Sequence, residues 1–376
     1  MAAGGEIVAK YVGHKISKAR WASARQGSLE PSDTFTTGGW DDHRNRLSVW
    51  QIEDIPAEPG AVTGTTPNEP ILVADTEHIG DVTDIQYVGP ESVVVASSSG
   101  NVSLYQYNTK RKVIYIEQVW ERMHFHLDQS CPCTSVATSQ TSSDIITAGE
   151  DGRLNVLKTG NQNPIRFYDS ADSTSINDIT FTTTSEVVGV TFSGQVKMWD
   201  LRNRNNKPSR TMLLSGDRVP LLCVDKHPTQ PHLLAAGGQD GVLSIWDMRQ
   251  EQYPVTLLEG HSAEVWEVKF HPQKADHLFT CSEDGSVWQW DGTSMSAPSG
   301  HSTLHGITSN TLNLTSAADT SVSPWLSVDA TKHRMETYSL LADNRLSINC
   351  LDIESRHLLC GSDCEAIFVI YDMVIR

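Results

Sequence analysis

Three residue types that hydrolases use together occur within the stretch from Gly260 to Gly292. It reads GHSAEVWEVKFHPQKADHLFTCSEDGSVWQWDG and contains His261, Ser282 and Asp284. In a Ser–His–Asp triad the histidine removes the serine proton and the aspartate orients the imidazole, so acyl transfer is the chemistry to consider. Catalysis also requires the serine to be exposed beside an oxyanion hole. The elements that position these three residues decide whether that requirement can be met.

The stretch is one copy of an internal repeat. A shift of 44 residues places Pro220–Asp247 on Glu264–Asp291 without a gap. The matched dipeptides are His-Pro at 227 and 271, Asp-Gly at 240 and 284, and Trp-Asp at 246 and 290. Self-similarity at this period, ending in Trp-Asp, is typical of the WD40 β-propeller.

Weaker copies extend the repeat along the chain. The apolar residues that mark them are Trp50, Tyr105, Leu157, Trp199, Trp246, Trp290 and Tyr371. Five successive intervals, of 42 to 55 residues, fit one four-stranded blade each, and the last, of 81 residues, fits a blade plus an insertion. Runs such as DIITAGEDGRLNVL, which are β-rich and broken by Asp-Gly turns, favour hairpins. The sequence therefore predicts an all-β fold, a seven-bladed WD40 β-propeller.

The two ends of the chain are expected to complete one blade together. The strand-like segment Ala366–Met373 is followed by only three residues, so its blade lacks an outer strand. Glu6–Val12 also reads as a strand and precedes the start of the first blade. Pairing Glu6–Val12 with the C-terminal blade would close the ring and remove exposed sheet edges.

We predict a single propeller domain over residues 1–376 with two loop insertions. Residues 53–70 are rich in Pro, Gly and acidic side chains, and residues from about 292 to 330 are rich in Ser and Thr. Both compositions favour exposed loops. Part of the segment 292–327 is expected to supply the outer strand of the sixth blade, and Trp325 is expected to anchor this insertion to the ring.

The three triad-type residues match a structural feature of the repeat. In WD40 proteins a Gly-His pair, a Ser or Thr, a turn Asp and the Trp of Trp-Asp form a hydrogen-bonded ladder, and the matching positions here are His261, Ser282, Asp284 and Trp290. We expect Asp284 to accept from one imidazole nitrogen, and the Ser282 hydroxyl to lie between the other nitrogen and the indole N–H. Each buried polar group then has a partner. The set is therefore interpreted as structural, and no catalytic residue is predicted.

Four potential metal ligands gather in HFHLDQSCPC, namely His124, His126, Cys131 and Cys133. Zinc binds Cys and His, but the His-x-His and Cys-x-Cys spacings are tighter than those of zinc knuckles, and no second cluster accompanies them. We expect a loop before the third blade, with Cys133 partly buried, and no metal site. The sequence also lacks a phosphate-binding Gly-Lys-Ser/Thr loop and a dinucleotide motif, so no cofactor is predicted.

The amino-acid composition limits the kinds of partner that the chain is expected to bind. The 376 residues include 46 acidic and 29 basic side chains, which gives a formal net charge of −17. An acidic surface repels phosphates and anionic lipids, so we expect no direct binding of nucleic acid or membrane. No apolar run approaches the ~18 residues of a transmembrane helix. Seven cysteines, an odd number, argue against a disulfide framework and for a reducing compartment.

Longer motifs resemble one family of WD40 proteins over essentially the whole chain. AKYVGHKISKARW, SGDRVPLLCVDKHP, GGQDGVLSIWDMRQ, HLFTCSEDGSVWQWD and CGSDCEAIFVI look like segments of the small WD40-repeat nucleoporins of the Y-shaped scaffold complex in the outer rings of the nuclear pore. The resemblance implies a non-catalytic interaction scaffold without a small-molecule substrate. It implies binding to a helical-solenoid nucleoporin of the Y-complex short arm and to other Y-complex subunits. It further implies roles in pore assembly, mRNA and protein transport and, during cell division, at the kinetochore.

A pair of short motifs supports an alternative. Trp-Asp-x-Arg occurs at Trp199–Arg202 and at Trp246–Arg249. Such pairs resemble those of WD40 substrate receptors of cullin-4 ubiquitin ligases, which implies that Arg202 and Arg249 would present guanidinium groups to the ligase adaptor. The other interpretation is that each arginine pairs locally with an acidic side chain at a strand end, where exposed pairs contribute little.

Overall fold

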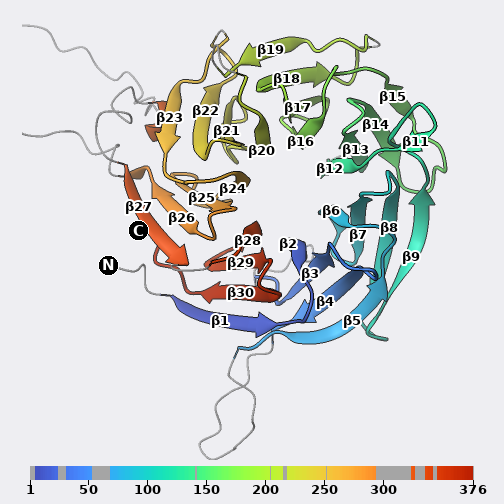
Figure 1. Cartoon of the computed structure of the whole chain (residues 1–376), viewed down its shortest axis with the longest axis vertical. Coiled ribbons are helices and arrows are strands. Elements are labelled where there is room, and N and C mark those ends of the chain that lie inside the picture. Colours follow the sequence, from blue (N-terminus) through green and yellow to red (C-terminus); the bar gives the residue numbers. More distant parts are fainter. Residues whose placement is uncertain are drawn as a thin grey trace, which may run out of the picture.

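The fold is a ring of β-sheets around a central channel. The computed structural model describes residues 5–23, 31–52, 68–139, 142–203, 205–214, 218–250, 252–293, 323–326, 335–341 and 345–375. Within these residues the strands form seven four-stranded antiparallel sheets, the blades, and one two-stranded hairpin (Figure 1). The predicted seven-bladed WD40 propeller is confirmed. No described helix is long and apolar enough to cross a membrane.

Six blades take their strands in chain order, from the channel to the outer rim. Blade 1 contains β2 (Ile16–Trp21), β3 (Thr34–Gly39), β4 (Arg46–Gln51) and β5 (Ile71–Glu77). Blade 2 contains β6 (Val82–Gly89), β7 (Ser92–Ser97), β8 (Val102–Asn108) and β9 (Val113–Trp120). The hairpin β10 (Phe125–His126) and β11 (Gln129–Ser130) precedes blade 3, which contains β12 (Cys133–Thr138), β13 (Asp144–Gly149), β14 (Leu154–Lys158) and β15 (Arg166–Tyr168).

The second half of the chain repeats this order. Blade 4 contains β16 (Ile176–Phe181), β17 (Glu186–Thr191), β18 (Gln195–Asp200) and β19 (Arg210–Leu213). Blade 5 contains β20 (Leu221–Lys226), β21 (Leu233–Gly238), β22 (Val242–Asp247) and β23 (Thr256–Glu259). Blade 6 contains β24 (Val265–Phe270), β25 (His277–Ser282), β26 (Val287–Asp291) and β27 (Glu336–Leu341).

Blade 7 joins the two ends of the chain. Its first three strands are β28 (Ile348–Glu354), β29 (His357–Ser362) and β30 (Ala366–Tyr371), and its outer strand is β1 (Glu6–Tyr11). The pairing is antiparallel and runs from Glu6 opposite Tyr371 to Tyr11 opposite Ala366. The predicted non-covalent closure by the N-terminal strand is confirmed.

The second strand of each blade is buried on both faces because it lies between neighbouring blades. Every residue of β21 and β25 is buried. This explains why these strands read as continuous apolar runs instead of alternating patterns. At Gly237 of β21, a Cβ atom would lie 2.6 Å from Cγ1 of Val265 in the next blade, so the close approach of the sheets requires glycine there.

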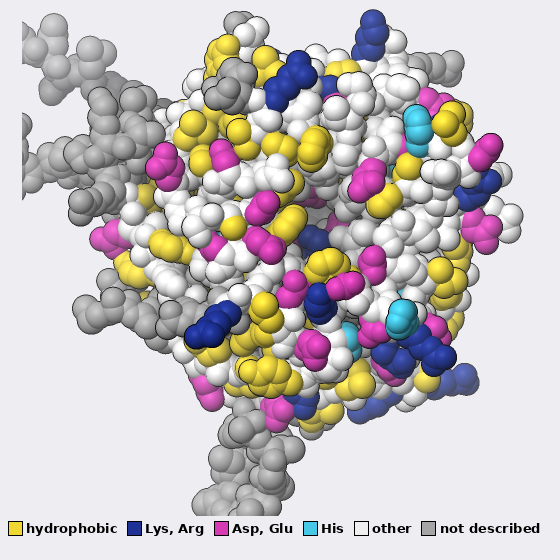
Figure 2. All heavy atoms as spheres, in the orientation of Figure 1, with side chains coloured by type: hydrophobic (Ala, Val, Ile, Leu, Met, Phe, Trp, Pro, Cys, Tyr) yellow, Lys and Arg dark blue, Asp and Glu magenta, His cyan; other side chains and the backbone are white. Residues whose placement is uncertain are grey.

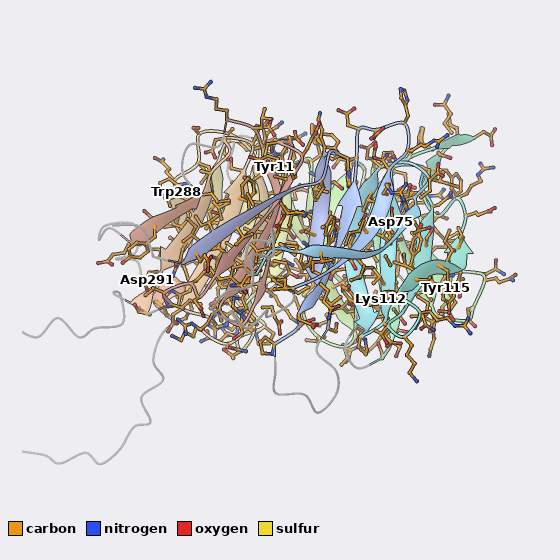
Figure 3. The ribbon with its side chains drawn as sticks, turned by 90° about the horizontal axis from the view of Figure 1, so that it is seen from below. Tyr11, Asp75, Lys112, Tyr115, Trp288 and Asp291 are labelled. Atoms are coloured by element: carbon orange, nitrogen blue, oxygen red, sulfur yellow. The ribbon has the colours of Figure 1, made fainter. Side chains whose placement is uncertain are left out.

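The disk has two faces. We call the side with the loops between successive blades, such as residues 260–264, the joining face. The side where the third strands end, at Asp200, Asp247 and Asp291, is the Trp-Asp face. Figure 3 shows the disk edge-on, with Tyr11 toward the joining face and Lys112 and Asp291 toward the Trp-Asp face.

Most of the two expected insertions, at 53–70 and 292–330, lies outside the described residues. The short 3-10 helix η2 (Pro324–Leu326) is described, and its Trp325 is fully buried. The Trp325 indole N–H donates to the carbonyl of Ala275 at 2.9 Å, and its ring lies 5.8 Å from that of Phe270. Trp325 thus anchors the chain to blade 6. The expectation that segment 292–327 supplies the outer strand of this blade is wrong, because β27 follows that segment.

Candidate functional site

Four side chains form a hydrogen-bonded chain in blade 6. Nδ1 of His261 lies 3.2 Å from Oδ2 of Asp284, and Nε2 lies 2.7 Å from Oγ1 of Thr280. The Trp290 indole N–H donates to the same Thr280 oxygen at 2.9 Å. Burial lowers the pKa of His261 despite the opposing effect of Asp284, which favours the neutral imidazole. In that form Nδ1–H donates to Asp284, and the Thr280 hydroxyl donates to Nε2.

Ser282 is not a member of this chain, and its assignment from the sequence is wrong. Its hydroxyl donates to a backbone carbonyl at 3.3 Å and accepts the N–H of Asp284 at 3.1 Å. The register explains the difference: Trp290 lies opposite Leu278 in β25, so the indole reaches the diagonal neighbour Thr280 on the same face. Ser282 lies two residues farther along the strand, roughly 7 Å away at ~3.4 Å per residue.

The arrangement does not match that of a hydrolase triad. Among the described hydrogen bonds, His261 makes none to Ser282, so the imidazole is not placed to remove that proton. The Ser282 side chain is also fully buried. A nucleophilic serine needs an accessible hydroxyl beside a general base. What these side chains can do is hold the turn after β25 and the loop before β24 against blade 6.

A second ladder of the same design lies in blade 3, and the sequence reasoning missed it. Nδ1 of His124 lies 2.9 Å from Oδ1 of Asp151, and Nε2 lies 2.8 Å from Oγ1 of Thr147. Thr147 and Asp151 are spaced like Thr280 and Asp284, and this spacing could have found the site. The match was hidden because the apolar marker of this blade is a leucine in place of tryptophan.

The blade 3 ladder also accounts for part of the cluster of potential metal ligands. Both ring nitrogens of His124 face side chains of blade 3. Cys133 is fully buried at the start of β12, and burial raises the pKa of its thiol. His126 and Cys131 lie in and beside the β10–β11 hairpin. In the part of the chain that the structure describes, no three His, Cys, Asp or Glu side chains converge as metal ligands would.

The hydroxyl–indole bond recurs in two blades in which no described hydrogen bond joins a histidine to the hydroxyl. The Trp50 indole donates to Thr37 at 2.9 Å in blade 1, and the Trp246 indole donates to Ser244 at 2.9 Å in blade 5. In each case the donor and acceptor belong to strands of one blade. Each of these bonds therefore stabilises its own blade, independently of the other blades.

Arg202 and Arg249 fold back onto the aspartates of their own Trp-Asp motifs. Nη2 of Arg202 lies 2.8 Å from Oδ2 of Asp200, and Nη2 of Arg249 lies 2.8 Å from Oδ2 of Asp247. Nε of each arginine donates to the same carboxylate. The side chains remain 70% and 61% exposed at the Trp-Asp face. The geometry is that of the local pairing considered from the sequence, and such exposed pairs contribute little to stability.

The innermost strands line a channel of about 1120 Å³. Figure 2 shows its opening near the centre of the disk, with acidic and basic side chains around it. These strands have no strand neighbour on the channel side, so their free N–H groups need other partners. Carboxylates of the preceding blade accept them at 2.8 to 3.1 Å: Asp84 from Val136, Asp178 from Val224, Asp225 from Phe270, Glu267 from Leu351, and Asp352 from Trp21.

Basic side chains balance part of this carboxylate belt. Nζ of Lys18 lies 3.6 Å from Oε2 of Glu267, and Arg20 also contacts this carboxylate. Burial alone would raise the pKa of Glu267, but the charges of Arg20, Lys18 and Lys269 outweigh it and lower the pKa to about 2. Burial, reinforced by a neighbouring carboxylate, raises the pKa of Asp178 to about 6. The belt joins blade to blade, which makes the channel a structural element of the ring.

Comparison with known proteins adds evidence that covers the whole chain. The family model described as WD domain, G-beta repeat matches residues 206–247 and 252–291. The chain is similar to Nucleoporin Nup43 of Homo sapiens and of Mus musculus, with 43% identity over 377 residues that cover 97% of this chain and 98% of each relative. A shorter similarity, 30% over 147 residues, links it to the nuclear pore complex protein nup43 of Dictyostelium discoideum and covers 39% of this chain and 34% of that protein.

Proposed function

The chain belongs to the Nup43 family of nucleoporins, and on this premise we propose that it is a structural scaffold subunit of the nuclear pore complex. The observation that carries the proposal is the 43% identity over nearly the full length of both proteins. The similarity thus extends over nearly the whole ring and is not confined to a few generic repeats.

The proposal extends to a place within the pore. The motifs shared with the small WD40 nucleoporins support assignment to the Y-shaped complex, with a helical-solenoid nucleoporin of its short arm and other Y-complex subunits as partners. The same resemblance supports contributions to pore assembly and to mRNA and protein transport, and a kinetochore location in mitosis. A closed disk with loops on both faces offers surfaces for several partners, although the fold alone does not fix the function.

We propose that the protein acts without catalysis. Both histidines of the ladders, His124 and His261, are bound to structural partners within their own blades. The buried carboxylates of the channel accept backbone N–H groups and balance basic side chains. These side chains therefore have roles in holding the ring together.

Live imaging of the fluorescently tagged full chain tests this location. The expected result is a signal at the nuclear rim in interphase and at kinetochores in mitosis. A diffuse signal in both phases would contradict the scaffold role. A rim signal without a kinetochore signal would remove only the mitotic part of the proposal.

A substrate receptor of a cullin-4 ligase is not favoured. The full-length relatives are nucleoporins, and Arg202 and Arg249 are each paired with their own aspartate. Replacing both arginines by alanine is expected to leave pore association unchanged and to change the free energy of unfolding only slightly, because pairs of exposed side chains contribute little. Loss of a co-purifying ligase adaptor, with pore association intact, would instead favour the receptor role.

A further inference from the structure

The outer strand of blade 2, β9, exposes more large apolar side chains than the other outer strands. Four of them are between 39% and 49% exposed, namely Val113, Tyr115, Ile116 and Val119. In the part of the chain that the structure describes, every other outer strand exposes at most two. A long apolar strand at the edge of a sheet is a template for pairing with another chain unless something covers it.

Only part of this edge is open. One edge of β9 pairs with β8, and no described strand pairs with the other. A bulge interrupts the ladder between Ile116 and Gln118. Beyond it, a turn of blade 3 covers the strand, because the side chains of Gln118 and Trp120 both donate to the carbonyl of Asn161, at 2.6 and 2.7 Å. The open part is therefore Val113–Ile116, with the sequence VIYI.

The neighbouring blade extends the apolar surface. Ile71 and Leu72, at the start of β5, are 38% and 47% exposed, and β5 contacts β9 along the rim. Both strands begin at the Trp-Asp face, so these two residues lie at the same end as Val113. Figure 3 shows β5 and β9 at the rim, with Tyr115 and Lys112 pointing outward.

The charges beside the open edge are unlike those of the chain as a whole. The turn that leads into β9 carries Lys110, Arg111 and Lys112, all exposed, whereas the chain has a formal net charge of −17. Glu117 and Glu121 are exposed toward the other end of the strand. A strand added antiparallel to β9 would place its C-terminal end beside the three basic side chains. Charge complementarity therefore favours acidic residues there.

We propose that Val113–Ile116 is the docking edge for an extended acidic segment of a partner protein, which adds to blade 2 as a fifth strand. Main-chain hydrogen bonds supply the affinity, and alternate β-branched or aromatic side chains meet the apolar rim. A second copy of the chain is disfavoured as the occupant, because two molecules each of charge −17 repel one another. The inference rests on the proposed scaffold function, for which it supplies one specific contact.

Photo-crosslinking in cells tests the occupant. A photo-crosslinking amino acid is placed at position 115 of the full chain, and a matched control carries it at position 167 in β15, where Phe167 is 58% exposed. Position 115 is expected to crosslink to a segment of a nucleoporin with net negative charge, and position 167 is not. Crosslinks to a basic segment, to a second copy or equally from both positions would overturn the proposal.

Variants of the edge separate this inference from the proposed function. Tyr115→Lys with Ile116→Lys is expected to lower capture of the crosslinked protein about tenfold or more, whereas Phe167→Lys leaves it unchanged. Lys110→Glu with Arg111→Glu and Lys112→Glu, outside the sheet, should weaken capture while the melting temperature stays the same. If the wild type captures pore proteins and these variants capture equal amounts, only the docking edge is refuted. If the wild type captures no nucleoporin, the proposed function itself fails.

Hydrogen exchange then distinguishes strand addition from side-chain contact. The probe is a synthetic peptide of the crosslinked segment, added to the purified full chain. Amides within Val113–Ile116 are expected to exchange more slowly with the peptide bound, because an added strand accepts their free N–H groups. Unchanged exchange there, with the peptide bound, would contradict a fifth strand.

Discussion

The guanidinium of Arg20 in blade 1 contacts the carboxylate of Glu267 in blade 6, although blade 7 lies between them in the ring. The same guanidinium lies 3.4 Å from the carboxylate of Asp84 in blade 2 and 3.4 Å from the carbonyl of Leu351 in blade 7. One buried side chain thus connects four blades beside the point where the ring closes. Variants of the Arg20–Glu267 pair therefore test how much the side chains of the channel contribute to the stability of the propeller.

Glu267→Gln is expected to destabilise the fold by roughly 3–5 kcal/mol, because removing one partner of a buried pair leaves the other charge uncompensated. Glutamine keeps the size of the side chain, so the effect reports the charge. Chemical denaturation measures it. Glu259→Gln is the matched control, since Glu259 is exposed on an outer strand of the neighbouring blade and should change stability by less than ~0.5 kcal/mol. Equal effects of the two variants on the free energy of unfolding would show that Glu267 in the channel contributes no more to stability than an exposed glutamate does.

The difference between wild type and Glu267→Gln should also depend on pH. The folded-state pKa of Glu267, about 2, lies below the ordinary value of 4.5. Its ionised form therefore stabilises the fold fully above about pH 4.5, and this contribution is lost as the pH falls toward 2. Stability curves of both proteins should run parallel near neutral pH and converge below about pH 4.5. Convergence already between pH 7 and 6 would contradict the assignment to this carboxylate.

Much of the fold could be predicted because its sequence signal lies within a single blade and recurs from one blade to the next. The spacing of the seven apolar markers, from Trp50 to Tyr371, predicts the number of blades, and the strand-like segments at the two ends of the chain predict the pairing of β1 with β30. Contacts between blades carry no such signal. Arg20 and Glu267 are 247 positions apart, and nothing in a single repeat indicates that they meet.

The ladder in blade 6 shows a finer limit to what the sequence can predict. The sequence points to His261, Asp284 and Trp290, but the choice between Thr280 and Ser282 depends on strand register. Aligning the repeats by their His-Pro, Asp-Gly and Trp-Asp pairs does not show how β25 and β26 are paired. It therefore does not show which hydroxyl of β25 the Trp290 indole reaches. The pairing was therefore assigned to a serine two residues too far along the strand.

A double-mutant cycle distinguishes the two hydroxyls. His261→Ala alone should cost about 1–3 kcal/mol, because it leaves buried polar groups without partners. Combined with Thr280→Val, it should show a coupling of ~0.5–3 kcal/mol, the range for residues in direct contact. Combined with Ser282→Ala, the effects should be nearly additive. Strong coupling to Ser282 and none to Thr280 would restore the assignment made from the sequence.

Deletion of residues 1–12 tests the closure of the ring. It removes β1, exposes the outer edge of β30 and frees the last blade from the start of the chain. We expect a large drop in melting temperature and a tendency to associate through the open edge. Thermal unfolding and light scattering measure these effects. An unchanged melting temperature in a monomeric protein would contradict closure by this strand.

Affinity capture of the tagged full chain from interphase cells, with crosslink mapping and mass spectrometry, is the decisive measurement for the scaffold role. We expect nucleoporins of the Y-shaped complex to be recovered, with crosslinks from the propeller to a helical-solenoid subunit. Recovery of ligase adaptors without any nucleoporin would contradict it.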